Sequence, residues 1–317
     1  MRTSIEDLIK KAGDSFPGKV FVGNSSDIKV QKIGSGISSL DNILGGGIPR
    51  GRSMIVSGEF STGKSTLCAF IIAECQRKEL FCVYIDAEKA LDPEWFKLLG
   101  VDIDKLIVTK PNYGEEATAM ALYFLKENAD LIVLDSIAAL VPLDEINEDM
   151  EQHHMGLQPR LVNKTLRKIL AENNNSAFIA INQLRETIGK PGIYRVMPGG
   201  KGQYFFSSII LEVSRKEWIT EGAEKKKVGF VMNCFTAKNK LAQPFQQTEI
   251  PFNFSTGQVD YTSVLFNLAC DIGLINKVKT SYFYGERRLA VGKDASIEVL
   301  KVDEVLQKEL KKKINIG

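Results

Sequence analysis

Histidine is almost absent from this sequence of 317 residues, and none of its cysteines form a Cys-x-x-Cys pair. The two histidines, His153 and His154, are adjacent, so a zinc site with histidine ligands has almost nothing to use. The five cysteines are an odd number and encode neither a zinc ribbon nor a disulfide framework. We expect Cys68 and Cys75, which share a predicted helix, to be small buried apolar side chains.

Long apolar segments are also missing. No stretch approaches the ~18 apolar residues that a membrane span needs, and the apolar run 131–134 ends at Asp135. Residues 1–7 contain acids before any hydrophobic block, which is not the pattern of a secretory signal. We therefore expect a cytoplasmic protein with no membrane partner.

Neither sign of charge dominates the chain. Lysine and arginine number 41 and the acids 39, and a net charge of +2 does not by itself indicate a nucleic-acid partner. Charge is segregated locally, however. Residues 184–203 contain four basic residues and one acid, and residues 144–151 contain five acids and no basic residue. A composition of 44% hydrophobic and 25% charged residues excludes global disorder.

Apolar strands alternate with helical patterns from about Gly34, which predicts βαβ units and a mostly parallel sheet flanked by helices. The expected strands are 53–57, 80–86, 131–135 and 177–181, and the expected helices are 64–78, 114–127 and 156–173. Residues 206–213 and 228–237 are expected to form an antiparallel hairpin. We expect three parts: an N-terminal segment with a short helix (1–33), a core (34–260), and a small α/β C-terminal domain (261–317) with a lysine-rich helix after the N-cap candidate Asp303.

The most specific motif spans the end of one strand and the start of the next helix. It fits G-x-x-x-x-G-K-[ST] through Gly58, Glu59, Phe60, Ser61, Thr62, Gly63, Lys64 and Ser65, and Thr66 follows. Its backbone amides can wrap a phosphate, and the helix N-terminus adds partial positive charge. We expect Lys64 to neutralise the β- and γ-phosphates of a bound nucleotide and Ser65 to bind Mg²⁺.

Three carboxylates follow predicted strands at the same edge of the sheet. Asp135 ends the strand 131–135, where it can reach the water shell of the metal ion. Hydrolysis also needs a base that orients and polarises the attacking water. Asp86 and Glu88 are equally placed for that role, and spacing alone does not choose between them.

Several stretches resemble signature segments of the bacterial RecA recombinase family, in the family's order and at close to its spacing. They are residues 34–52, 84–93 (YIDAEKALDP), 134–142 (LDSIAALVP), 154–157 (HMGL), 181–183 (INQ) and 238–240 (KNK). The resemblance covers essentially the whole chain and is densest from residue 34 to 254. It implies a RecA-type P-loop ATPase core with an antiparallel hairpin extension, a short N-terminal polymerisation segment and a small C-terminal domain.

The resemblance also implies roles for residues whose spacing is not informative. Glu88 matches the catalytic glutamate, and Gln183 matches the glutamine that senses the γ-phosphate and relays its state to a DNA loop. Lys238 and Lys240 match a pair that reaches a neighbouring subunit's ATP. Contacts to the adenine base are implied for Asp92, Trp95 and Phe254.

Two loops of this sequence resemble the DNA-binding loops of the family, residues 145–157 and 184–203. Between them, Arg160, Lys164, Arg167 and Lys168 form a basic stripe at helical spacing, opposite Leu157, Leu161, Thr165 and Ile169. A solvated helix face would explain such a stripe in most proteins, but Arg160 and Arg167 coincide with phosphate-contacting arginines of the family. The full set of implied DNA contacts is Met155, Gly156, Arg160, Asn163, Arg167, Arg185, Ile188, Gly199 and Gly200.

The sequence departs from the family pattern at several positions. Lys89 replaces a histidine, Tyr204 replaces an interface lysine, and the second loop is about one residue shorter. The resemblance nevertheless implies a DNA-dependent ATPase that uses ATP and Mg²⁺, forms helical filaments on single-stranded DNA and pairs that strand with homologous duplex DNA. Two alternatives remain: a ring-forming DNA helicase on the same core, and a non-enzymatic regulator that uses ATP only as a switch.

Overall fold

The computed structural model describes residues 4–147, 156–186 and 195–314, and the chain divides into two units, residues 1–31 and 32–317. In the first unit, the helix predicted at the N-terminus is confirmed as α1 (Ile5–Ser15). The Ser4 hydroxyl accepts a hydrogen bond from the Asp7 backbone N–H and caps this helix. A 3-10 turn, η1 (Ser26–Ile28), follows. No residue of α1 is buried, so its apolar side chains contribute to no core within this unit.

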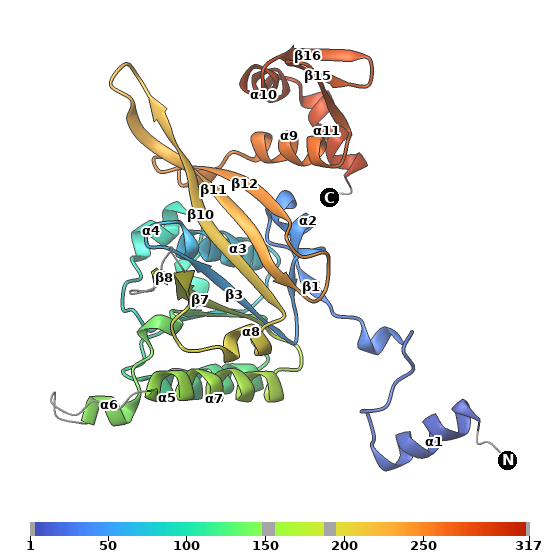
Figure 1. The fold of residues 1–317 in the computed structure, drawn as a ribbon, viewed down its shortest axis with the longest axis vertical. Coiled ribbons are helices and arrows are strands. Elements are labelled where there is room, and N and C mark those ends of the chain that lie inside the picture. Colours follow the sequence, from blue (N-terminus) through green and yellow to red (C-terminus); the bar gives the residue numbers. More distant parts are fainter. Residues whose placement is uncertain (1–3, 148–155, 187–194, 315–317) are drawn as a thin grey trace. The chain divides into compact units, whose positions relative to one another are not determined.

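A nine-stranded sheet forms the centre of the second unit, in the order β13-β12-β11-β10-β3-β7-β6-β4-β5 (Figure 1). The predicted mostly parallel sheet is confirmed, and six neighbouring strands of it are parallel: β10 (Ile209–Glu221), β3 (Arg52–Gly58), β7 (Ala177–Gln183), β6 (Leu131–Asp135), β4 (Cys82–Asp86) and β5 (Leu106–Thr109). Strand β5 was not among the expected strands, and β10 was expected only as part of the antiparallel hairpin. The antiparallel strands are β11 (Lys226–Asn239), β12 (Gln247–Asn253) and β13 (Gln258–Val259). The carboxyl ends of the parallel strands therefore meet at one edge of the sheet.

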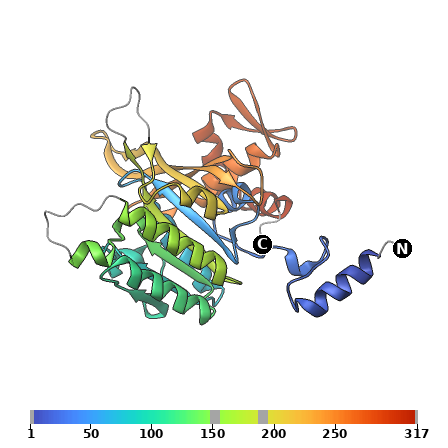
Figure 2. The same ribbon diagram turned by 60° about the horizontal axis from the view of Figure 1, so that its bottom comes forward.

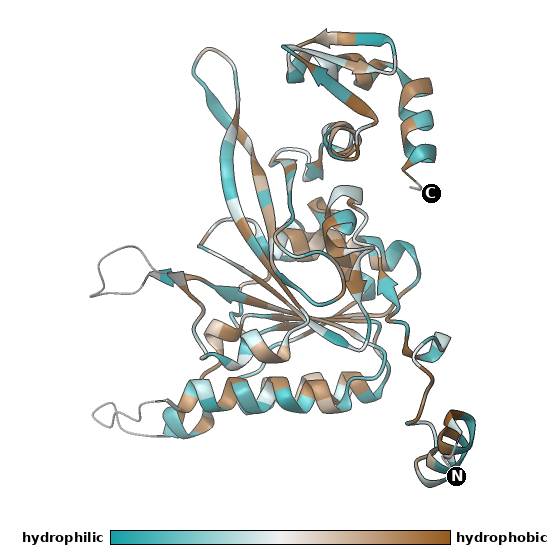
Figure 3. Ribbon diagram, turned by 45° about the vertical axis from the view of Figure 1, so that its right-hand side comes forward, coloured by the Kyte–Doolittle hydropathy of each residue, from teal (hydrophilic) through white to brown (hydrophobic). Residues whose placement is uncertain are grey.

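Helices cover both faces of this sheet. On one face pack α2 (Ser38–Leu44), α3 (Lys64–Arg77) and α4 (Pro93–Leu98), and on the other lie α5 (Gly114–Lys126) and α7 (Leu157–Glu172), side by side (Figures 1 and 2). Alternate residues of β6 enter the two cores, Val133 on the α3 side and Ile132 on the α5 side. Such strands are apolar without alternation because both of their faces are buried (Figure 3).

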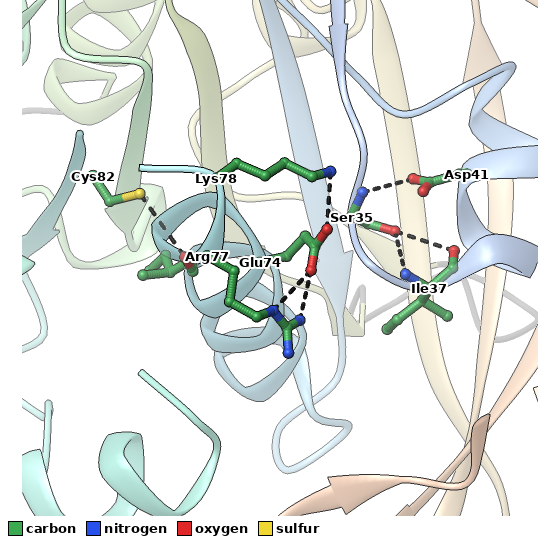
Figure 4. A network of polar contacts seen from close by, with 8 residues as sticks. Ser35, Ile37, Asp41, Glu74, Arg77, Lys78 and Cys82 are labelled. Carbon is green, nitrogen blue, oxygen red and sulfur yellow. Dashed lines mark hydrogen bonds and ion pairs between the residues drawn. The ribbon is translucent and has the colours of Figure 1, made fainter. Parts of the chain in front are cut away.

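The segment that leads into the phosphate loop is fastened by a polar network (Figure 4). The Asp41 carboxylate accepts a hydrogen bond of 2.8 Å from the Ser35 backbone N–H, and burial raises the pKa of this carboxyl against the opposing effect of that bond. On α3, Glu74 pairs with Lys78 at 2.9 Å and with Arg77 at 2.6 Å. The two sets of contacts are neighbours, since a Cβ on Gly34 would lie 3.2 Å from Lys78 Nζ and one on Gly36 would lie 3.0 Å from Glu74 Oε2.

The remaining elements of the core are short. They are β1 (Lys32–Ile33), β2 (Ile48–Pro49), η2 (Ile103–Lys105), η3 (Ile137–Ala139), α6 (Leu143–Asn147), β8 (Arg185–Glu186), β9 (Arg195–Val196) and α8 (Gly202–Phe206). Residue 206, expected to begin a strand, instead ends α8, and the strand begins at Ile209. The aromatic run of α8 favours a strand locally, but Lys238 of β11 and Lys240 just after it donate hydrogen bonds to the backbone carbonyls of α8 and of its C-cap residue, Ser207.

The C-terminal residues form a small α/β assembly around their own hydrophobic cluster. It comprises α9 (Tyr261–Asp271), β14 (Ile275–Val278), β15 (Ser281–Tyr284), β16 (Arg287–Val291), α10 (Lys293–Val302) and α11 (Glu304–Lys313). Asp303 caps α11 as predicted, since its Oδ1 accepts a hydrogen bond of 2.9 Å from the Leu306 N–H. The division of the chain at residue 260 stays a prediction.

No helix in the part of the chain that the structure describes is long and apolar enough to cross a membrane.

Candidate functional site

The phosphate loop joins β3 to α3 at the carboxyl edge of the sheet, as the motif predicts. A Cβ atom on Gly58 would lie 2.1 Å from the Val213 carbonyl oxygen, so only glycine fits beside β10. Gly63 has a φ of 92°, and a Cβ there would lie 2.8 Å from Sδ of Met232. The two glycines therefore determine the shape of the loop and allow it to pack closely against β10 and β11.

Lys64 is buried at the start of α3, and its Nζ donates a hydrogen bond of 2.5 Å to the Glu59 carbonyl oxygen. Burial lowers the pKa of this ammonium group, while the carboxylates of Asp135 and Glu88 raise it. The lysine thus faces acidic groups from two other strands. Its position matches a group that neutralises phosphate charge.

The other loop residues contribute mainly their backbone. Phe60 is 82% exposed, Ser61 is exposed with a φ of 54°, and Thr66 is half-buried. Thr62 is buried and donates from Oγ1 to the Glu59 carbonyl at 3.0 Å. The loop curls back on itself, and its backbone N–H groups supply the chemistry expected of a phosphate cradle.

Ser65 and Asp135 meet as expected for a metal site. Ser65 Oγ donates a hydrogen bond of 2.7 Å to Asp135 Oδ2, and the Tyr84 hydroxyl donates to the same oxygen at 2.5 Å. Burial raises the pKa of the Asp135 carboxyl, and these two donors oppose that rise. Tyr84 was not singled out from the sequence, although its place in a buried strand beside β6 could have indicated it.

The donor set fits Mg²⁺ rather than a metal held by protein ligands alone. A hydroxyl and a carboxylate are hard oxygen ligands, and Mg²⁺ is typically bound by one or two carboxylates with water and substrate phosphates. Among the described residues, no cluster of three or more histidine, cysteine, aspartate or glutamate side chains could hold a metal ion. Ser65 and Asp135 would therefore share the ion with a bound nucleotide.

The structure separates the two carboxylates that spacing left equivalent. The Asp86 carboxylate is buried and accepts hydrogen bonds from the backbone N–H groups of Ala90 and Leu91, so it holds the turn after β4. Glu88 Oε1 instead accepts from Ser136 Oγ at 2.5 Å and from Gln183 Nε2 at 3.0 Å. Glu88 lies among Lys64, Asp135 and Gln183, whereas Asp86 is committed to the fold.

Residues expected at the nucleotide base gather around an aromatic cluster, which we define as Trp95, Trp218, Phe230, Phe252 and Phe254. Trp95 and Phe254 lie on two sides of Phe252, with ring centroids 6.2 and 5.7 Å from it. Asp92 caps α4 by accepting from the Trp95 N–H at 2.7 Å. Phe230 and Phe252 were not singled out from the sequence. Apolar residues at alternate positions of β11 and β12 could have indicated that both rings point into the core.

Lys238 and Lys240 do not reach the phosphate loop of their own chain. Lys238 Nζ donates to the carbonyls of Tyr204 and Ser207, and Lys240 Nζ donates to that of Phe205 at 3.4 Å. The phosphate loop lies beside Met232, six residues earlier in β11. At ~3.3 Å per residue this separation is about 20 Å, which a lysine side chain cannot span.

The basic stripe lies on the exposed face of α7, and Leu161, Thr165 and Ile169 on the opposite face are buried. Thr165 Oγ1 forms a hydrogen bond of 2.7 Å with Thr118 of α5, which fixes the orientation of the helix. No ion pair engages the four basic side chains within the described ranges. The stripe thus presents positive charge on the exposed face of α7.

Of the other expected DNA contacts, Gly156 is the N-cap residue of α7 and Arg185 is exposed on β8. Gly199 and Gly200 have φ angles of 89° and 80°. Asn163 is half-buried, and a Cβ on Gly202 would overlap its Oδ1, so Asn163 packs against α8. Met155 and Ile188 lie outside the described residues.

A hydrogen-bond chain connects the end of β7 to the first turn of α8 and to the residues before it. Asn182 Nδ2 donates to Gln203 Oε1 at 2.6 Å and to the Pro198 carbonyl at 3.0 Å. Gln203 Nε2 in turn donates to the carbonyls of Pro198 and Gly200. We call residues 184–203 the basic loop. Strand β7, which carries Gln183, is therefore hydrogen-bonded to the C-terminal end of the basic loop.

Comparison with known proteins agrees with this arrangement. The sequence profile of the RecA N-terminal domain matches residues 2–259. Protein RecA of Aquifex pyrophilus is 40% identical over 292 residues, which is 90% of this chain and 83% of the relative. Protein RecA of Thermus aquaticus is 39% identical over 320 residues, covering 99% of this chain and 94% of the relative. Protein RecA of Acholeplasma laidlawii (strain PG-8A) is 39% identical over 298 residues, covering 92% and 89%.

The match extends through the phosphate loop, the carboxylates beside it and the strand that carries Gln183. A ring-forming helicase finds no support in these similarities. The chain belongs to the RecA family and is a DNA-dependent ATPase that acts as a recombinase.

Proposed function

We propose that this recombinase binds ATP with Mg²⁺, assembles as a helical filament on single-stranded DNA and pairs that strand with homologous duplex DNA. The observation that carries the proposal is the hydrogen bond of 3.0 Å between Gln183 and Glu88. It joins a carboxylate beside the phosphate loop to the strand from which the basic loop departs. The Gln183–Glu88 hydrogen bond therefore links the residue proposed to activate water to the loop proposed to bind DNA.

In the nucleotide site, Lys64 and the loop amides hold the phosphates, and Ser65 and Asp135 hold the metal ion. The bound ion would supply positive charge next to the developing negative charge of the transferred phosphoryl group. Glu88 orients a water molecule and accepts its proton at Oε1 or Oε2. The hydroxyl of Ser136, 2.5 Å from Oε1, holds the carboxylate in position for this step.

Gln183 is the relay in this proposal. Its amide is bonded to Glu88 Oε1, and a γ-phosphate beside Glu88 offers it an alternative acceptor. A shift of Gln183 acts on Asn182, whose Oδ1 accepts from the Gln183 backbone N–H at 2.9 Å. Asn182 then acts on Gln203 and Pro198, so the nucleotide state reaches the loop that binds the strand.

The DNA strand in this proposal lies along the basic stripe and the basic loop. Exposed arginines at Arg160, Arg167 and Arg185 would contact phosphates, which gives affinity without sequence preference. Gly199 and Gly200 join this contact through the backbone shape of the loop, because their positive φ angles let it pack against Val162 and Pro159 of α7. Sequence-independent contacts suit a recombinase, because base pairing must stay free to read the homologous strand.

Lys238 and Lys240 act on the ATP of a neighbouring protomer. The support is their distance of about 20 Å from their own phosphate loop at ~3.3 Å per strand residue. Both side chains are anchored to carbonyl oxygens of α8, and burial, together with the nearby charge of Lys240, lowers the pKa of Lys238. A neighbour's triphosphate would give both lysines an anionic partner.

Electron microscopy of negatively stained samples tests this function directly. With single-stranded DNA and a slowly hydrolysed ATP analogue, we expect helical filaments, and Lys64→Ala should form none under the same conditions. In parallel, wild-type protein should exchange strands with homologous but not with heterologous duplex. Closed rings, or equal reaction with both duplexes, would contradict the proposal and favour a DNA motor.

A further inference from the structure

A bulge in β10 determines which side chains of this strand share a face with Trp218. Residues three apart in a regular strand point to opposite faces. Here the register against β11 shifts between Arg215 and Glu217, so one extra residue is inserted. Arg215 therefore shares a face with Trp218, and its Cζ lies 4.2 Å from the centre of the indole ring. Lys216 points elsewhere and pairs with Glu249 of β12 at 2.5 Å.

The indole of Trp218 contacts two cations as well as other rings of the aromatic cluster. Lys227 Nζ is 4.4 Å from the indole centre, so two positive groups contact one ring. The indole is 6.4 Å from the ring of Phe254 and 6.2 Å from that of Phe230. It remains 38% exposed, at the outer end of the cluster.

The cluster extends without a break to the phosphate loop. Phe254 is 5.7 Å from both Phe230 and Phe252. Phe230 Cζ lies 3.0 Å from the place where a Cβ on Gly63 would be. Phe230 therefore contacts both Phe254 and the phosphate loop at Gly63.

We propose that Trp218 is a positioning residue for the nucleotide base: it holds the ring of Phe254 against the base, and Arg215 and Lys227 hold the indole. This inference rests on the proposed contact between Phe254 and the base. Phe254 follows the end of β12, where its backbone N–H donates a hydrogen bond of 2.8 Å to the Val228 carbonyl of β11, and its side chain is half-buried. The rigid indole limits the rotation of that ring, and the cations limit the rotation of the indole.

Binding measurements with two ligands test the proposal, ATP and tripolyphosphate, which lacks a base. In Trp218→Ala, we expect the Kd for ATP to rise about threefold to tenfold, the range of one aromatic pair. The Kd for tripolyphosphate should change by less than about twofold, since the phosphate loop is intact. KM for ATP should rise more than kcat falls, and Trp218→Phe should recover most of the ATP affinity.

Lys216→Gln is the matched control, because it removes a neighbouring cation from the opposite face and should change neither Kd. The double substitution of Arg215→Gln and Lys227→Gln should weaken ATP binding by a smaller factor than Trp218→Ala. Equal losses for ATP and tripolyphosphate in Trp218→Ala would assign Trp218 a general structural role and overturn the proposal. Unchanged ATP affinity would also overturn it.

Phe254→Ala distinguishes the role of Trp218 from the contact between Phe254 and the base. If Phe254→Ala weakens ATP binding and Trp218→Ala does not, the role of Trp218 is wrong and the base site stands. If neither substitution weakens ATP binding, the base lies elsewhere, and the proposed contact of Phe254 fails together with this inference.

Discussion

Gln183 donates a hydrogen bond from Nε2 to Oε1 of Glu88, across 3.0 Å, although 95 positions separate the two residues in the sequence. Gln183 ends β7 and Glu88 follows β4, and the two strands lie on either side of β6. Parallel strands bring these ends to one edge of the sheet, where Asp135 ends β6. The contact is thus a direct product of the sheet topology.

Glu88→Gln should stop turnover while ATP stays bound. The amide cannot accept a proton from water, but the phosphate loop and metal site are unchanged. We expect DNA-stimulated hydrolysis to fall about 10²- to 10⁴-fold, the usual contribution of a general base. Steady-state hydrolysis and equilibrium binding of a labelled ATP measure the two effects. An unchanged hydrolysis rate would remove Glu88 from its role.

Protomers with Lys238→Ala should complement protomers with Lys64→Ala. The first retain a working phosphate loop, and the second retain the lysines that would act on it across an interface. A mixture should recover part of the DNA-dependent ATPase activity that each variant lacks alone. If filaments form at every mixing ratio and no activity returns, the lysines do not act on a neighbour.

Arg160→Ala and Arg167→Ala should each weaken binding to all single-stranded sequences alike. A phosphate contact releases counterions, so each loss should flatten the slope of log affinity against log salt by roughly 0.7. Fluorescence anisotropy over a salt series measures this slope. Lys311→Ala on α11 is the control and should leave it unchanged. A full slope in Arg167→Ala with a reduced slope in Lys311→Ala would place the strand elsewhere.

Asp130→Ala should destabilise the fold without touching the site. Its Oδ1 pairs with Arg50 at 2.6 Å and its Oδ2 accepts from the Phe81 N–H at 2.9 Å, with both charged side chains largely buried. Leaving Arg50 unpaired should cost about 2–4 kcal/mol in urea unfolding. Glu94→Ala breaks an exposed pair with Lys97, which water screens, and should lower the free energy of unfolding far less than Asp130→Ala does. Equal losses of unfolding free energy in the two variants would contradict the burial of the Arg50–Asp130 pair.

The phosphate loop and the buried strand 131–135 could be predicted because their signals are local. A glycine pattern between strand and helix has one structural solution, and a strand buried on both faces is apolar throughout. The preference for Glu88 over Asp86 could not be predicted from spacing, because it depends on which carboxylate the next turn captures. The place of Trp218 was equally hidden, since a bulge reverses the face on which Arg215 lies.

The central claim is that Gln183 couples the nucleotide site to the DNA loop, and Gln183→Ala tests it most directly. The measurement is the ratio of ATP hydrolysis rates with and without saturating single-stranded DNA, in wild-type protein and in this variant. The variant keeps Glu88 and the backbone N–H that is bonded to Asn182, but it loses the side-chain amide that contacts Glu88. The account therefore predicts that the ratio falls to near one. A ratio equal to that of the wild-type protein would show that the DNA signal reaches Glu88 by another route.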